Sequence, residues 1–290
     1  MDSEKSQKQD KQQEDLDNSK DFMGIIKSIP IIWPVVNFFN KTFVITELEI
    51  RKLRHDPTEL ISRVIQPIMW LLIFGEVLAH ARAIPTGHMS YMAFMAPGVL
   101  AQSVLFVAIF YGIAVIWERD LGIVYKFLSS PAPRSALVLG KAISAGIRGF
   151  SQAIIVYIVA LLLRIPLDLN ILPLLGVLVF IMLGAIIFST FSLIIACIVK
   201  VRERFMGIGQ LMTMPLFFAS NAIYPIALMP RWLQIFSHIN PLTYEIDAIR
   251  HLMVLNAPSV YGIGKDFGIL LGASIVIVWI GSKIYPNIAT

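Results

Sequence analysis

Few residues in this chain have the type and spacing that catalysis requires. The sequence contains no phosphate-binding loop of the form Gly-x-x-x-x-Gly-Lys-Ser/Thr, and the nearest run, at residues 262–266, lacks the spacing and the hydroxyl residue. A His-Glu-x-x-His helix, a cysteine pair and a Gly-x-Ser-x-Gly turn are also missing, and the single Cys197 lies in an apolar run. We therefore expect no catalytic residue, metal site or cofactor on this chain, which should not hydrolyse ATP alone.

The remaining polar candidates are charged or aromatic residues inside apolar stretches. Arg148 lies several turns into one such stretch. A central charge in a membrane helix costs about 2.5–3.5 kcal/mol on insertion scales, so it usually faces protein or water. Arg148 is thus predicted to line a pathway or meet an anionic headgroup, unless it snorkels to the inner interface. Phe217, Phe218 and Tyr224 either contact an apolar cargo or pack between helices.

The amino-acid composition indicates the class of protein in which these residues lie. Hydrophobic residues make up 57% of the 290, charged residues 15%, and the mean hydropathy is +0.73. Soluble domains carry about 25% charged residues, so a soluble fold is excluded. The net charge of +5 comes from basic residues between apolar blocks. That distribution indicates membrane topology and excludes nucleic acid as a partner.

The pattern predicts an all-α membrane protein with six transmembrane helices, because about 20 apolar residues cross the hydrocarbon. Residues 1–21 are expected to be a disordered cytoplasmic tail, 22–58 a membrane-interface and amphipathic segment, and 59–290 the membrane domain. The predicted spans cover residues 62–81, 91–117, 137–163, 171–199, 206–228 and 266–285.

The segment before the first span has two predicted parts. Pro30 and Pro34 interrupt an apolar stretch at residues 22–40, which is too short to span and should lie at the interface. Residues 41–57 follow as a helix that ends at an Asp-Pro pair, although its apolar residues do not form one clean stripe.

Orientation follows from the excess of Lys and Arg on one set of loops. This excess places both termini and the loop at residues 118–136 in the cytoplasm of a multi-pass cell-membrane protein. Residues 229–265 lie outside, but they are too apolar for an ordinary loop, so short re-entrant helices are expected there. Within that region Asp247 has helical spacing with Arg250 or His251, which predicts a buried ion pair that holds the re-entrant helices together.

Two longer motifs resemble those of a known family. Residues 117–122 (Trp-Glu-Arg-Asp-Leu-Gly) precede Lys-Phe-Leu-Ser-Ser-Pro at 126–131 and Gly-Lys at 140–141. Met-Pro-Arg-Trp-Leu at 229–233 precedes Asn-Pro-Leu-Thr-Tyr at 240–244, and a weaker match is Ala-Pro-Gly at 96–98. From about Lys41 to the C-terminus, this pattern resembles ABC-2 type transporter permeases of the drug-resistance and polysaccharide-export group.

The resemblance implies a six-span half-transporter that forms a homodimer and binds an ABC ATPase subunit, which carries ATP and Mg. The helix near residues 41–56 would be its interface helix. The residues implied to couple the chain to the ATPase are Glu118, Arg119, Gly122, Ser130 and Pro131. They would form a short coupling helix whose ends are set by Gly122 and Pro131. The residues implied in the outer gate region are Pro225, Asn240, Pro241, Tyr244, Asp247 and Arg250.

The predicted function is export of a hydrophobic or amphiphilic cargo, a drug-like compound or a lipid, across the cell membrane. Export of lipid-linked polysaccharide is the alternative within the same family. An ion-gradient-driven secondary transporter is the alternative from another class. It would need carboxylates within the membrane, and the sequence places almost none there.

Overall fold

The computed structural model describes residues 32–55, 65–81, 84–87, 89–130, 132–199 and 201–288. The predicted tail at residues 1–21 lies outside them. Apart from loops and an isolated bridge, the described residues are helical. The longer elements are α2 (Ile32–His55), α6 (Tyr91–Asp120), α8 (Arg134–Leu162), α9 (Ile171–Val199), α10 (Arg202–Phe218), α12 (Pro241–Met253) and α13 (Ile263–Ile284). The shorter ones are α4 (Ile65–Met69), the π-helix η1 (Trp70–Gly75), α5 (Glu76–Ala81), α7 (Ile123–Ser129), η2 (Ile226–Leu228), α11 (Arg231–Ile239) and η3 (Tyr285–Ile288).

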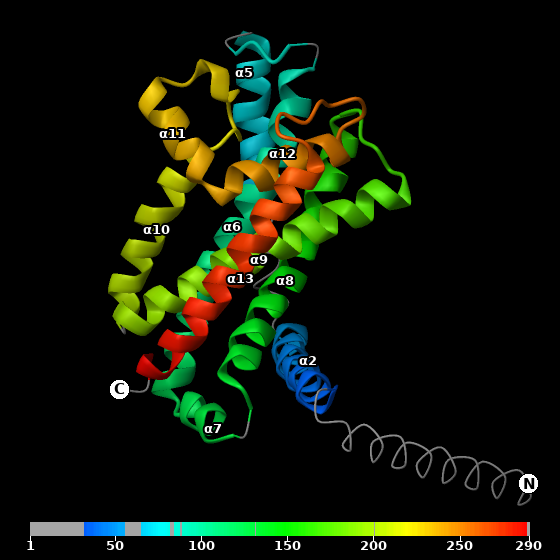
Figure 1. Cartoon of the computed structure of the whole chain (residues 1–290). Coiled ribbons are helices and arrows are strands. Elements are labelled where there is room, and N and C mark those ends of the chain that lie inside the picture. The colour runs from blue at the N-terminus through cyan, green and yellow to red at the C-terminus, as the bar shows by residue number, and fades with distance from the viewer. Residues whose placement is uncertain are drawn as a thin grey trace, which may run out of the picture.

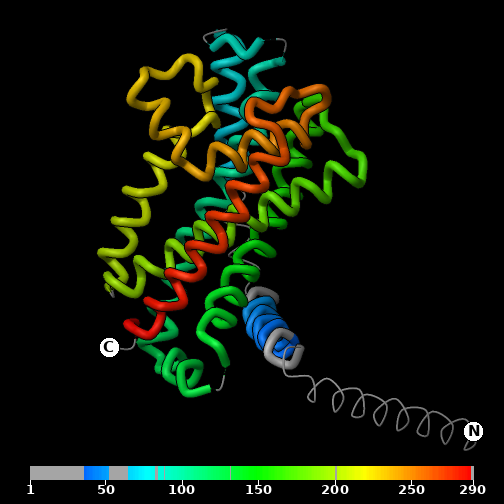
Figure 2. The backbone as a smooth tube through the Cα atoms, in the orientation of Figure 1, coloured from blue at the N-terminus to red at the C-terminus, as the bar shows by residue number. Residues whose placement is uncertain are grey.

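Four of the six predicted spans are confirmed as helices that are long and apolar enough to cross a membrane. They are α6, α8, α9 and α13 with η3. The helical bundle has two distinct ends. Figures 1 and 2 show α2, α7 and the C-terminus at one end, hereafter the α7 end, and α5, α11 and α12 at the other, hereafter the α12 end.

The two other predicted spans differ from expectation, and a count of six stays a prediction. The first is an apolar helix at Ile65–Ala81, which is shorter and has a π-helical middle. The fifth was predicted at residues 206–228 but is helical only over Arg202–Phe218. Pro215 lies in its last turn, and a proline removes one helical hydrogen bond, which favours an early end. The backbone from Ala219 to Pro225 then forms turns.

The interface segment also differs from expectation. Helix α2 runs through Pro34 without a break, because a proline in the first turn gives up no helical hydrogen bond. The face that α2 turns inward is mostly polar, with Thr42, Thr46 and Glu49 buried beside Ile45. Its large apolar side chains face outward, and Phe39 and Phe43 are more than 60% exposed. This arrangement suits a helix whose outer surface meets lipid.

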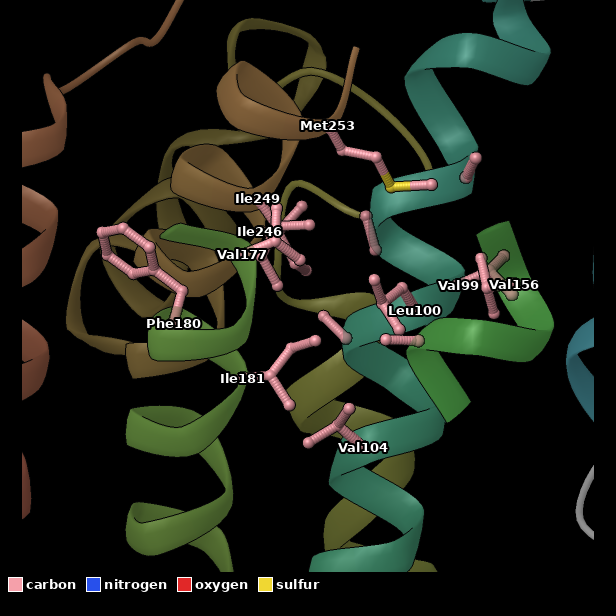
Figure 3. Close-up of a cluster of buried hydrophobic side chains, with 14 of the residues drawn as sticks. Val99, Leu100, Val104, Val156, Val177, Phe180, Ile181, Ile246, Ile249 and Met253 are labelled. Carbon is pink, nitrogen blue, oxygen red and sulfur yellow. The ribbon is translucent and has the colours of Figure 1, made fainter. Parts of the chain in front are cut away.

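The main core lies toward the α12 end, where α6, α8, α9 and α12 meet. Figure 3 shows Leu100 and Val104 of α6 facing Ile181 of α9, with Ile246 and Ile249 of α12 above them. The turn between α8 and α9 is joined to the end of α12 by a bridge between Leu167 and Val254. This core fixes α12 on the bundle, whereas α11 projects away from it (Figure 1).

Candidate functional site

The segment predicted to meet an ATPase is a helical corner at the α7 end. Helix α6 ends at Asp120, and α7 begins after Gly122, whose φ of +73° is a left-handed conformation that glycine adopts without strain. Ser130 ends α7 and its hydroxyl donates to the Phe127 carbonyl at 2.7 Å. Gly122 therefore lies where the motif placed a helix end, while Pro131 lies outside the described residues.

The outer surface of this corner is apolar. The side chains of Trp117, Leu121 and Tyr125 are 50%, 68% and 51% exposed. Arg119, also predicted to couple to the ATPase, is bonded to the neighbouring Asp120 at 2.7 Å. Exposed apolar side chains beside charged ones at a helix corner are suited to protein contact.

A buried group of charges lies directly behind the corner. The Lys141 ammonium, only 1% exposed, contacts the Glu118 carboxylate and lies 3.2 Å from a Glu49 oxygen. Arg148 lies 3.8 Å from the other Glu49 oxygen, and its guanidinium is 4.9 Å from the centre of the Tyr111 ring. We name Glu49, Glu118, Lys141 and Arg148 the ion cluster. Its formal charges cancel, as buried charges require.

The ion cluster joins α2, α6 and α8, and sequence reasoning found only part of it. The resemblance implies ATPase coupling for Glu118, a pathway or headgroup role is predicted for Arg148, Lys141 enters as part of the Gly-Lys motif, and no role is assigned to Glu49. One usable signal was the seven-residue spacing of Lys141 and Arg148, which places both on one face of α8. The cluster places Arg148 against protein, and its pathway role stays a prediction.

At the α12 end, Asp247 and Arg250 have separate partners instead of the expected ion pair. The Asp247 carboxylate accepts hydrogen bonds from the Ser259 hydroxyl at 2.8 Å and from the backbone N–H groups of Val260 and Tyr261. Arg250 donates to the carbonyls of Phe94 and Asn221, at 3.2 and 2.6 Å. Both residues therefore hold the loops that flank α12 in place.

The other predicted gate residues position α11 and α12. Asn240 caps α12 by accepting from the Leu242 N–H at 3.0 Å, and Pro241 occupies its first turn. The Tyr244 hydroxyl donates to the His238 carbonyl at 2.7 Å. Pro225 precedes the short helix η2. The structure thus brings five of these residues together around α12, with Pro225 apart from them.

An apolar groove of about 810 Å³ lies between α10 and α11. Phe218 and Tyr224, two of the three aromatics weighed for cargo contact, line it together with Trp232 of α11. Phe217, the third, is 1% exposed and packs edge-on against Trp70 of η1. The groove is thus an apolar surface, and Phe217 is part of the packing behind it.

One buried carboxyl group was missed altogether. Glu245 lies in the region predicted to form short re-entrant helices outside, and its side chain is fully buried where α12 packs on Gly184 of α9. Neither carboxyl oxygen has a hydrogen-bond partner among the described residues. An ionised group in that setting would be very costly, so we expect the neutral acid there. The run of polar residues in α12 hid this burial from the sequence.

The long apolar helices define a multi-pass membrane protein, and an apolar groove lies on its surface. The described residues hold no cluster of metal-ligating side chains. The ABC-2 type transporter family model matches residues 40–254, so the chain belongs to that family, whose permeases generally work with an ATPase subunit.

Three relatives place the chain among permeases. The transport permease ycf38 of Cyanophora paradoxa is 29% identical over 250 residues, which cover 83% of this chain and 84% of the relative. The daunorubicin resistance ABC transporter permease protein DrrB1 of Streptomyces coeruleorubidus is 26% identical, with 69% and 70% covered. The inner membrane transport permease YadH of Escherichia coli K12 is 25% identical, with 73% and 81% covered.

Proposed function

We propose that this chain is the permease subunit of an ATP-driven exporter that moves a hydrophobic or amphiphilic cargo out across the cell membrane. The observation that carries this proposal is the apolar groove between α10 and α11. An apolar lining of this volume suits a drug-like compound or a lipid chain better than a sugar polymer. The drug-resistance relative supports the same class of cargo.

The driving force would come from a separate ATPase subunit bound at the α7 end, in the cytoplasm, which would hold ATP and Mg. The exposed Trp117, Leu121 and Tyr125 would form the contact surface on this chain. A second copy of the chain would complete the transporter. Exposed apolar side chains on the first span and on α10, such as Phe74 and Leu211, offer a face for that copy.

The proposed function is tested by purifying the tagged chain from cells in which it is expressed with a candidate ABC ATPase subunit. We expect the ATPase to co-purify, and proteoliposomes of the complex to accumulate daunorubicin when ATP is added. Uptake driven by a proton gradient without the ATPase would contradict the proposal. That result would favour the secondary transporter, for which the buried Glu245 carboxyl would be the first ion site to examine.

Topology gives a direct prediction. In a Cys197→Ala background, Pro258→Cys at the α12 end should react with a membrane-impermeant maleimide on intact cells. Ser129→Cys in α7 should react only after the cells are opened. Both positions are exposed, so accessibility from each side of the membrane decides the outcome. The reverse pattern would place α7 outside and exclude an ATPase contact there.

The groove gives a second prediction. Trp232 lines it, whereas Ile235 on the same helix is exposed but does not. We expect Trp232→Ala to weaken daunorubicin binding about tenfold, because it removes an aromatic side chain that the bound cargo would cover, and Ile235→Ala to leave it unchanged. Fluorescence titration of the purified complex measures both affinities. Equal affinities for the two variants would remove the groove from the cargo route.

A further inference from the structure

The first residue of α10 is attached to the last turn of α6. The Arg202 guanidinium lies 2.6 Å from an Asp120 carboxylate oxygen and 3.9 Å from the centre of the Trp117 ring. Trp117 and Asp120 directly precede the Gly122 turn that leads into α7. A displacement of α7 must therefore move the group to which Arg202 is bound.

One turn further along α10, Phe205 is packed more tightly than Arg202. Its ring is fully buried and packs with Ile116 of α6 and Ala196 of α9. A methyl group at Gly112 of α6 would overlap this ring, so the glycine leaves the space that Phe205 fills. Close-packed side chains transmit displacement because they leave no room to absorb it.

Beyond Phe205 only one face of the helix stays packed, with Gly209 and Thr213 buried. The opposite face is open, and Leu211 is 73% exposed there. At the α12 end, the Asn240 side-chain amide donates to the carbonyls of Leu216 and Ala219, at 2.7 and 3.3 Å. Pro215 has no N–H to give to the carbonyl one turn before it, so a bend is favoured near this position.

We propose that Arg202 and Phe205 transmit movement of the corner between α6 and α7 to α10. This movement of α10 would change the shape of the apolar groove. This inference rests on the proposed function and names the route from the ATPase to the cargo surface. Leu211, Pro215 and Leu216 line the groove on the stretch of α10 that would bend. Because Asn240 holds the outer end of α10, a displacement at Arg202 changes the shape of that stretch.

The Asp120–Arg202 pair suits this role more than a role in stability. Both side chains are about one-third exposed, at 35% and 34%, and such pairs add little to the free energy of unfolding. Their geometry nevertheless fixes the start of α10, because the guanidinium also lies over the Trp117 ring. Arg202 is thus a positioning residue, and its loss should alter coupling before it alters folding.

The test uses the complete chain with its co-purified ATPase in proteoliposomes. Nitroxide labels at Gln210→Cys on α10 and Ser282→Cys on α13, in a Cys197→Ala background, report the distance between the helices. In the otherwise unmodified chain we expect ATP binding to change this distance. Arg202→Ala should abolish that change and lower cargo-stimulated ATP hydrolysis about fivefold, the lower end of ordinary coupling between sites, while basal hydrolysis persists.

Two further variants separate coupling from folding. Arg202→Lys, which keeps a cation near Asp120 and Trp117, should retain the ATP-dependent distance change, and Arg204→Ala, at an exposed position on the same turn, should leave it intact. The proposal would be overturned by a distance that ATP never changes, or by an Arg202→Ala chain that responds like the parent. An Arg202→Lys chain that responds no better than Arg202→Ala would also overturn it. A chain that binds no ATPase would instead contradict the proposed function.

Discussion

Replacing Lys141 with methionine should destabilise the protein more than most single changes, by about 3–5 kcal/mol, because it leaves two buried carboxylates facing one remaining cation. Methionine fills a similar volume, so the lost charge, and not a cavity, accounts for the effect. The free energy of unfolding, measured by SDS titration of the purified chain in mixed micelles, reports it.

A second substitution within the ion cluster should restore much of the stability lost in Lys141→Met. Adding Glu118→Gln to Lys141→Met leaves Glu49 and Arg148 as a balanced pair and should recover a large part of the loss. Lys126→Met, at an exposed position in α7, should change the free energy of unfolding by less than about 0.5 kcal/mol. If Lys141→Met were as stable as the parent, the cluster would not be a buried ion network.

Gly184→Ala is the second change with a large expected effect. A methyl group at this position would overlap the Glu245 carboxyl, and the atoms around both residues are fully packed. We expect a loss of about 1–3 kcal/mol, the usual cost of overpacking a core. The same SDS titration measures this loss, together with the stability of the variants below.

The cause of that loss can be isolated by changing Glu245 instead. Glu245→Ala combined with Gly184→Ala should recover stability, because the deleted carboxyl makes room for the methyl group. Glu245→Gln alone should be tolerated, since the amide has the shape of the neutral acid. If the double variant were no more stable than Gly184→Ala, the close approach of α9 and α12 would not depend on Glu245.

The sequence predicted the long spans well because hydropathy and length decide them. The boundaries of α9 agree with the prediction, and α6 and α8 differ from it by only a few residues. The motif also located the corner at Gly122. These features are local, since a long apolar run or a glycine turn can be recognised without knowing its neighbours in space.

Features set by contacts between helices could not be predicted in this way. The polar inward face of α2 has no recognisable pattern until Lys141 and Arg148 of α8 are placed beside Glu49. The burial of Glu245 depends on Gly184, which is 61 residues earlier in the chain. The groove depends on where α10 ends, and the apolar residues after Phe218 concealed that end.

The bridge between Leu167 and Val254 has a consequence for how different parts of the molecule exchange amide hydrogens with solvent. It fastens the α8–α9 turn to α12, and the Asp168 N–H adds a 2.9 Å bond to the Met253 carbonyl. Opening either segment would require separating it from the other, so their amides should exchange together and slowly in deuterated buffer. Amides of α11, which projects away from the core, should exchange well before them.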